Sequence, residues 1–373
     1  MKVAVALGMV SLLLLAGCDP TPAPAPSASA HPTPAANLGL TQAGDLRTHL
    51  DLILGEQVMI VAKETIAAVN HSDEYAAYTG LLTANAADLT QLMRRAFGNT
   101  TATKMSEAWS TQNSDLIDYA IGVVTHDDAR SKTAMTNLTT KFVPQFSQLL
   151  SDASHLPLDP VTQLESQQVL EDKAFIDDYF ANKVPTFYAD LHRAYGQSSR
   201  LGDALAVEIA SRFPDKFPGD PSSHAVFVRL QANLMLQEHS YLTTMATSAA
   251  IAGRTAEKNV AQSMLADRAA AVSALFASST GGLSAPLVAQ WTNEHSALFT
   301  YAAGDARAKP DLTQKFVNEF ASLAHVSKTH VFDHINAILK VIDDQRAKDA
   351  TAMANDDRAA ATSIQPIGDS IQG

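Results

Sequence analysis

The chain has a single cysteine, Cys18, among its 373 residues. Without a second thiol it can form no internal disulfide and no zinc–thiolate site. Basic residues are also fewer than acidic ones, 27 against 39, which gives a net charge of −12 at pH 7. Nucleic-acid-binding domains present a basic face, so we expect no nucleic-acid partner.

Several other signals are missing. There are no alternating strand-like runs bounded by turns, and after Cys18 no apolar stretch reaches the length of about 20 residues that spans a membrane. The sequence also lacks Gly-x-Ser-x-Gly, a phosphate-cradling glycine loop and His-Glu-x-x-His. These absences argue against the common hydrolases and nucleotide enzymes. We assign no catalytic residue and favour a protein that is not an enzyme, with unfamiliar chemistry left open.

The N-terminus carries an export signal. A lysine and a short apolar run precede Leu15-Ala16-Gly17-Cys18, which predicts a signal peptide over residues 1–17. This tetrapeptide resembles a bacterial lipobox. The resemblance implies that Cys18 becomes the first residue after cleavage and carries fatty acyl chains such as palmitate; the alternative is an ordinary signal peptide with an incidental cysteine. More than one acyl chain gives a stable anchor, so we expect a lipoprotein of the cell envelope, held extracytoplasmically on a membrane.

A linker follows the predicted lipidation site. Residues 19–38 are mostly Pro, Ala, Ser and Thr, and such a composition cannot bury enough apolar surface to offset its ordering entropy. We predict a disordered Pro/Ala-rich tether over residues 18–40 that lifts the folded part off the membrane.

The remainder has helical periodicity. Leu46, Leu50 and Ile53 lie on one stripe at spacings of four and three residues, and alanine, leucine, glutamine and glutamate are good helix formers. Short connections favour antiparallel neighbours. The sequence therefore predicts an all-α fold of up-and-down helical bundles.

The helical region contains an internal duplication. Glu56-Gln57 and Trp109 recur 182 residues later as Glu238-His239 and Trp291. Further matches follow at increments of 174 and 166: Lys141-Phe142-Val143 with Lys315-Phe316-Val317, Ile176-Asp177-Asp178 with Ile342-Asp343-Asp344, and Gly202-Asp203 with Gly368-Asp369. We predict two tandem bundles, the first over residues 41–220 and the second over 221–373.

The second copy is shorter than the first. One of the shortened connections falls within residues 311–345, and the structure of this stretch has two interpretations. Residues 311–345 contain no glycine or proline, so they could form one long helix. Alternatively a tight turn lies near His325-Val326-Ser327, with Ser327 as N-cap. We favour the turn, because the flanking helices match those of the first copy.

Histidines at three matched positions occur only in the second copy. Gln57, Asn113 and Gln168 of the first copy correspond to His239, His295 and His334. Each of these histidines lies on an apolar stripe of its own helix, and imidazole is the commonest protein ligand for metals. One hypothesis is therefore a transition-metal site of copper, iron or zinc in the second bundle, formed by His239, His295, His334 and Glu238, with His330 as a further ligand.

The competing hypothesis is an interior hydrogen-bond network. Amides occupy the matched positions of the first copy, so polarity is kept in both copies while metal affinity is not, and satisfied polar groups can fix helix register. The spacing also lacks the two Glu-x-x-His motifs of di-iron carboxylate bundles.

A family resemblance rests on Leu234-x-Leu236-x-Glu238-His239, on Trp291-x-x-x-His295 and on His334 nine residues before Asp343. This pattern is similar to a poorly characterised group of exported bacterial helical repeat proteins, some of which are named after copper amine oxidase-like regions that they adjoin. The resemblance implies export and a helical repeat, and no activity. Two functions follow from the sequence: a membrane-anchored binding or scaffold module for a protein or small apolar ligand, or a metal-binding or redox protein.

Overall fold

The structure is a computed structural model that describes residues 39–371. The predicted signal peptide, Cys18 and nearly all of the predicted tether lie outside the described residues. The described part is helical with no strand, which confirms the all-α class. None of its helices is both long enough and apolar enough to span a bilayer.

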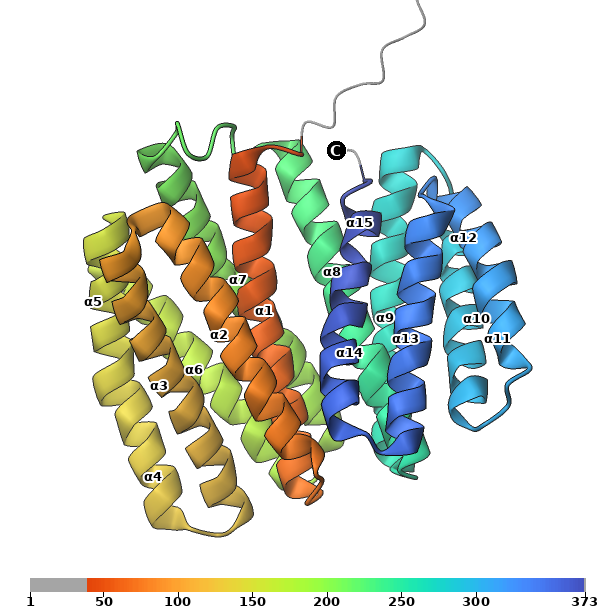
Figure 1. The fold of residues 1–373 in the computed structure, drawn as a ribbon, viewed down its shortest axis with the longest axis horizontal. Coiled ribbons are helices and arrows are strands. Elements are labelled where there is room, and N and C mark those ends of the chain that lie inside the picture. The colour runs from red at the N-terminus through yellow and green to blue at the C-terminus, as the bar shows by residue number, and fades with distance from the viewer. Residues whose placement is uncertain (1–38, 372–373) are drawn as a thin grey trace, which may run out of the picture. The chain divides into compact units, whose positions relative to one another are not determined.

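The first half of the fold, residues 41–220, is built from seven α-helices and one π-helical segment. They are α1 (Gln42–Val69), α2 (Glu74–Phe97), α3 (Asn99–Val124), α4 (Asp128–Asn137), the π-helical η1 (Leu138–Phe142), α5 (Val143–Ser154), α6 (Leu158–Phe180) and α7 (Val184–Arg212). Consecutive helices run in opposite directions, with α4, η1 and α5 forming one continuous run (Figure 1).

The second half, from residue 221 onward, repeats this order, and its α-helices from α10 onward are shorter than their counterparts. Its elements are α8 (His224–Ile251), α9 (Thr255–Thr280), α10 (Ser284–Ala302), α11 (Ala308–Pro310), the π-helical η2 (Asp311–Phe316), α12 (Val317–Ala324), α13 (Lys328–Ala347), α14 (Ala350–Ser363) and α15 (Gln365–Gly368). The matched pairs are α1 with α8, α2 with α9 and α3 with α10. The ten-residue α4 shrinks to the three-residue α11, and this shortening lies where the increment falls from 182 to 174.

The turn predicted near His325 is confirmed. His325 takes a left-handed conformation with φ 57° after α12, and Ser327, in an extended conformation, precedes the first residue of α13. The Ser327 side chain makes no capping hydrogen bond, so the backbone alone defines this helix start.

Matched contacts support the duplication. Arg47 Nε lies 2.5 Å from Asp203 Oδ1, and at the corresponding positions Arg229 Nε lies 2.7 Å from Asp369 Oδ1. Both pairs tie the first helix of a half to the end of that half. Because neither pairing follows from local sequence, their repetition shows that the two halves share a tertiary arrangement as well as a helical pattern.

A second matched pair joins the third helix of each half to the sixth. The Tyr119 hydroxyl donates to Asp177 Oδ1 at 2.5 Å, and the Tyr301 hydroxyl donates to Asp343 Oδ1 at 2.9 Å. The same tyrosine–aspartate hydrogen bond is therefore present in both halves, although the second half is shorter between its two partners.

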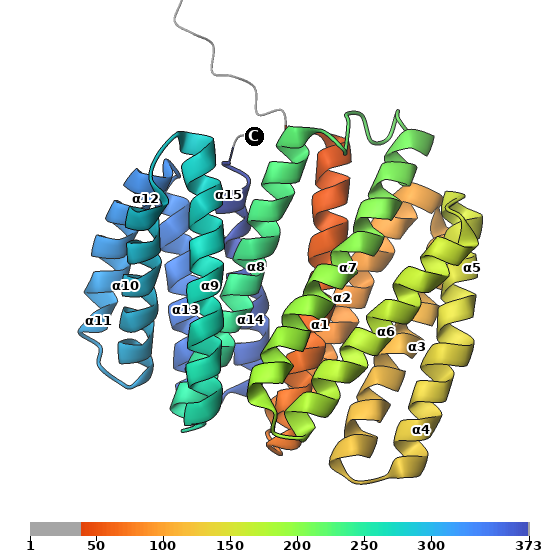
Figure 2. The ribbon, with the colours of Figure 1, turned by 180° about the vertical axis from the view of Figure 1, so that it is seen from behind.

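The two halves pack together, and the described residues belong to one compact unit. The equivalent helices α1 and α8 contact each other at its centre (Figures 1 and 2). The last long helix of each half also reaches across: α7 packs on α9, and α14 packs on α2. The halves therefore interlock, and the proposed boundary at residues 220–221 falls in the connection between α7 and α8.

A buried ion pair lies at this junction. Lys63 on α1 pairs with Asp357 on α14, and their side chains are 5% and 0% exposed. Lys63 Nζ also donates to Thr244 Oγ1 at 2.8 Å, while Asp357 accepts from the Tyr78 hydroxyl at 3.1 Å and from Thr244 Oγ1 at 2.6 Å. Charges taken out of water are tolerated when paired and hydrogen-bonded in this way.

Replacing one partner should test the pair's role. Lys63→Met leaves Asp357 buried without its cation, so we expect the free energy of unfolding, measured by urea denaturation, to fall by about 3–5 kcal/mol. The double variant Lys63→Met/Asp357→Leu should recover most of this loss. The control is Arg130→Met, because Arg130 and Asp118 form a pair whose side chains are 40% and 42% exposed, and such a pair contributes about 0–1 kcal/mol. Equal losses in Lys63→Met and Arg130→Met would contradict the prediction.

Candidate metal centre

The central residue of the candidate site is His239, in the middle of α8. The helix is enclosed by neighbours on nearly all sides, so the imidazole is only 1% exposed. Neither ring nitrogen has a hydrogen-bond partner. Its ring centroid lies 4.6 Å from the Trp291 ring and 5.2 Å from the His295 ring. A polar ring has thus been buried among aromatic groups that cannot satisfy its nitrogens.

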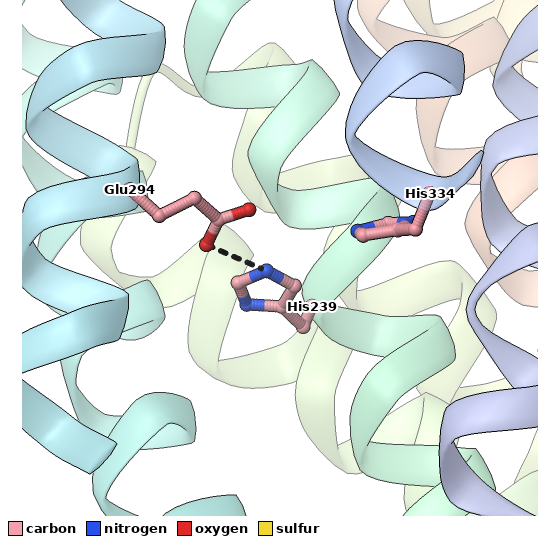
Figure 3. A group of neighbouring side chains, drawn as sticks. All are labelled: His239, Glu294 and His334. Atoms are coloured by element: carbon pink, nitrogen blue, oxygen red, sulfur yellow. Dashed lines mark ion pairs between the residues drawn. The ribbon is translucent and has the colours of Figure 1, made fainter. Parts of the chain in front are cut away.

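Glu294 on α10 faces the His239 ring (Figure 3). The residue is fully buried, and neither carboxylate oxygen has a hydrogen-bond partner. Its Oε2 lies 3.6 Å from His239 Nε2 and 3.8 Å from His295 Nε2. These distances are too long for hydrogen bonds and leave room for something between the groups.

His334 on α13 completes the cluster from a third helix (Figure 3). Its Nδ1 lies 3.3 Å from the carbonyl oxygen of Ala360 and 3.3 Å from Ser363 Oγ. A proton on Nδ1 can be donated to that carbonyl, which assigns the lone pair to Nε2. Nε2 is buried and unpartnered. Such an outer contact is the usual way in which a protein fixes the tautomer of a metal-binding histidine.

The donor atoms converge. One ligand atom each from His239, Glu294 and His334 lies within 4.8 Å of the other two. Metal–nitrogen bonds of about 2.0–2.1 Å place donors on opposite sides of an ion about 4.2 Å apart. A small inward movement of the side chains would therefore bring all three into a coordination sphere. His295 Nε2 is also unpartnered and lies 3.8 Å from Glu294 Oε2, beside the three residues whose donor atoms converge.

The electrostatics suit metal binding. Burial lowers the pKa of His239, His295 and His334 to about 4 in each case, so the rings are neutral near pH 7, the form that binds metals. Burial raises the pKa of Glu294, opposed by the neighbouring imidazoles His295 and His334. Unpartnered polar atoms in a dry interior cost about 1–3 kcal/mol each, and an ion at the centre would satisfy this whole group together.

Of the predicted ligands, the structure brings together the donor atoms of His239 and His334, joined by Glu294. His295 lies beside this group, and the other two predicted ligands lie apart from it. Glu238 turns away: its Oε1 lies 2.7 Å from His192 Nδ1 and its Oε2 lies 3.8 Å from Arg268 Nη1. Glu238 therefore faces other neighbours than His239 does, and it is not among the residues whose donor atoms converge. This corrects the assignment of Glu238, whose first-half counterpart Glu56 pairs with Arg358 in the same manner.

His330 is likewise not part of the group. It is half-buried, one turn before His334 on α13, and it is not among the residues whose donor atoms converge. The ligand that sequence reasoning did not select is Glu294. The signal for it was present, because Glu294 lies 182 residues after Gln112, a polar residue at the matched position.

Amides fill the corresponding positions of the first half. Gln57, Gln112, Asn113 and Gln168 stand where the second half has His239, Glu294, His295 and His334. Gln57 Nε2 donates to Asn113 Oδ1 at 3.0 Å, and Gln168 Nε2 donates to Asp172 Oδ1 at 2.8 Å. The first half thus has one hydrogen bond between two of the matched amides, Gln57 and Asn113, whereas neither polar atom of Gln112 has a partner. The second half shows no equivalent bonds between its histidines, so the two hypotheses apply to different halves.

Comparison with known proteins gives no further guide: no family model, no curated protein and no solved structure matches the chain. The family resemblance stated from the sequence therefore stays an expectation, and the site's chemistry has to be argued from its own geometry.

Two buried acids near the first-half amides make stability depend on pH. Burial, with Asp172 nearby, raises the pKa of Glu165 from 4.5 to about 8, and burial raises the pKa of Asp172 from 3.8 to about 7. The folded state therefore holds protons that the unfolded chain has released. We expect the free energy of unfolding to fall as the pH rises from about 4 to about 8, by up to about 1.4 kcal/mol per pH unit for each proton held.

Urea denaturation across this pH range checks the assignment. Glu165→Gln should flatten the slope between about pH 4.5 and 8, because the amide does not titrate. Asp152→Asn, at an exposed position, should leave the slope unchanged. An unaltered slope in Glu165→Gln would show that Glu165 is not the residue responsible.

Proposed function

We propose that this chain is an extracytoplasmic, lipid-anchored helical protein whose second half binds one transition-metal ion. The observation that carries the metal proposal is the meeting of buried donor atoms without partners from α8, α10 and α13. Each helix contributes polar atoms that nothing in the protein satisfies, and they face one another.

The donor set indicates the class of ion. Three imidazole nitrogens and one carboxylate suit zinc, copper, iron and nickel, whereas calcium and magnesium take oxygen ligands. Trp291 packs over His239, and the donor residues are at most 9% exposed. A centre so enclosed favours holding an ion, or passing electrons, over turning over a substrate, which would need an open coordination position within reach of solvent.

The location is proposed from the N-terminal sequence alone. The lipobox resemblance of Leu15-Ala16-Gly17-Cys18 supports export and acylation of Cys18. Intact-mass measurement of the protein recovered from a bacterial membrane would test this directly: the lipidated form starts at Cys18 and carries the mass of its acyl chains.

A binding or scaffold role is a second candidate, and a groove between the halves favours it. The groove has a volume of about 330 Å³ and is lined in part by Glu56, Asp88, Arg95 and Arg358. Ligand sites of small size begin near this volume. Its charged lining favours a polar ligand or peptide over the apolar ligand expected from the sequence.

Metal binding is tested by transplanting the first half's residues. The variant His239→Gln/Glu294→Gln/His295→Asn/His334→Gln carries the amides that the first half packs at these positions, so it should fold. We expect one zinc or cobalt ion per wild-type chain by elemental mass spectrometry after metal titration, and none in the variant. His239→Gln alone should weaken binding by at least about 100-fold, since even groups that only orient a ligand are worth 10- to 100-fold.

The control for this experiment is His330→Gln, which removes a histidine of the same half outside the cluster and should bind as wild type does. Bound metal should also raise the unfolding temperature of the wild type, because an ion at 100 times its dissociation constant adds about 2.7 kcal/mol. Equal binding by the wild type and the four-residue variant would refute the site.

A further inference from the structure

The two ends of the helical unit differ in character. Because helices alternate in direction, the connections fall into two sets, one at the end where α1 begins and one at the opposite end (Figures 1 and 2). The opposite set comprises residues 70–73, 125–127, 181–183, 252–254, 303–307 and 348–349. It contains no apolar side chain larger than alanine, as expected of an end that faces water.

The end where α1 begins carries exposed charges, Asp215, Lys216 and Asp220, in the connection between α7 and α8, but it differs from the opposite end in also carrying large apolar residues. Its connections carry large apolar residues that include Leu40, Leu156, Leu283 and Val326. Leu283, before the first residue of α10, is 77% exposed, and Leu40, before α1, is 52% exposed. Leu156 and Val326 are partly buried against the core, whereas Leu283 and Leu40 are mostly exposed and call for another explanation.

The exposed apolar side chains follow the same division. Among the described residues, eight large hydrophobic residues are exposed. Seven of them lie in this end's connections or within about two turns of them: Leu40, Leu158, Val207, Phe227, Leu283, Leu323 and Phe332. The eighth, Leu170, lies in the middle of α6, and none lies at the opposite end. Single exposed hydrophobics are ordinary, but a random scatter would not avoid one end.

We propose that this end rests on the surface of a phospholipid bilayer, with its exposed leucine and phenylalanine side chains in the interface. This inference rests on the proposed anchoring through Cys18. It changes the expected role of residues 19–38, which then hold the folded part against the membrane instead of clear of it.

The chain's own connectivity selects the bilayer as the partner. The described chain begins at Gly39, at the apolar end, 21 residues after Cys18. Even a fully extended chain of that length reaches only about 75 Å. Anchoring at Cys18 therefore keeps this end close to lipid, and at such high effective concentration weak apolar contacts become populated.

The distribution of the side chains also suits a bilayer. The exposed groups come from both halves and from separate helix ends, and none of them lines the groove between the halves. A fluid lipid interface accepts such projections individually, each gaining from the apolar area that it buries. A second copy of the chain is disfavoured by the net charge of −12, which makes copies repel one another.

The test places a fluorophore at either end of one helix. The full chain, exported and acylated, is reconstituted in vesicles of zwitterionic phosphatidylcholine. Cys18 is the only cysteine, and acylation blocks its thiol, so Leu283→Cys provides a single labelling site before α10. Ala303→Cys, exposed just after α10, is the matched control. With an environment-sensitive dye we expect a blue shift and quenching by spin-labelled lipid at position 283 and neither at 303.

Similar spectra at the two positions would overturn the proposal. So would a blue shift at 283 that disappears as the lipid-to-protein ratio rises, because that result assigns the apolar end to a second copy. If intact mass shows no acyl chain, the anchoring fails, and the wild-type chain is instead coupled through its Cys18 thiol to maleimide lipid. Slower hydrogen exchange in residues 281–287 than in the uncoupled chain, with no change in 303–307, would support the membrane face; unchanged exchange in both would refute it.

Discussion

The structure depends on the burial of α1 and α8, which lie against each other and are surrounded by the remaining helices. A helix enclosed on all sides cannot direct its polar residues to solvent, and each unpartnered group costs stability. Every polar residue on these two helices must therefore find a partner inside the protein. Lys63 finds Asp357 and Glu56 finds Arg358, in both cases across the junction between the halves. His239, at the same depth, finds no hydrogen-bond partner, and neither do the hydroxyls of Thr48, Ser240 and Thr243.

The duplication explains why an unpartnered histidine lies at position 239. Contacts that define the shared framework, such as Arg47 with Asp203 and Arg229 with Asp369, occur in both halves. The interior polar positions kept their polarity but changed their chemistry: Gln57 has a hydrogen-bond partner in its own half, whereas His239 does not. A pocket that holds an amide hydrogen bond in the first half holds a group of imidazole nitrogens in the second, and in this arrangement His239 Nδ1 and Nε2, His295 Nε2 and His334 Nε2 make no hydrogen bonds.

The helices, the turn at His325 and the grouping of three histidines could be predicted, because periodicity and matched spacing are local signals. Glu238 was assigned to the site wrongly for a physical reason. On a helix buried all round, an apolar stripe does not tell which side faces the next helix, so Glu238 and His239 looked equivalent. Glu294 could have been found through Gln112. The interlocking of α7 with α9 could not, since contacts between distant segments leave no trace in a single sequence.

The enclosure of the proposed metal centre has a consequence for how an ion would enter. His239, Glu294 and His334 come from three helices that are distant in the chain, so the donors exist as a set only when the second half is packed. Metal binding and packing are then one coupled equilibrium, and an ion held under Trp291 could leave only through local opening. The first half, complete with its amides, needs no ion to pack. Through α1 it offers α8 a formed surface, on which the second half would pack before it captures the proposed ion.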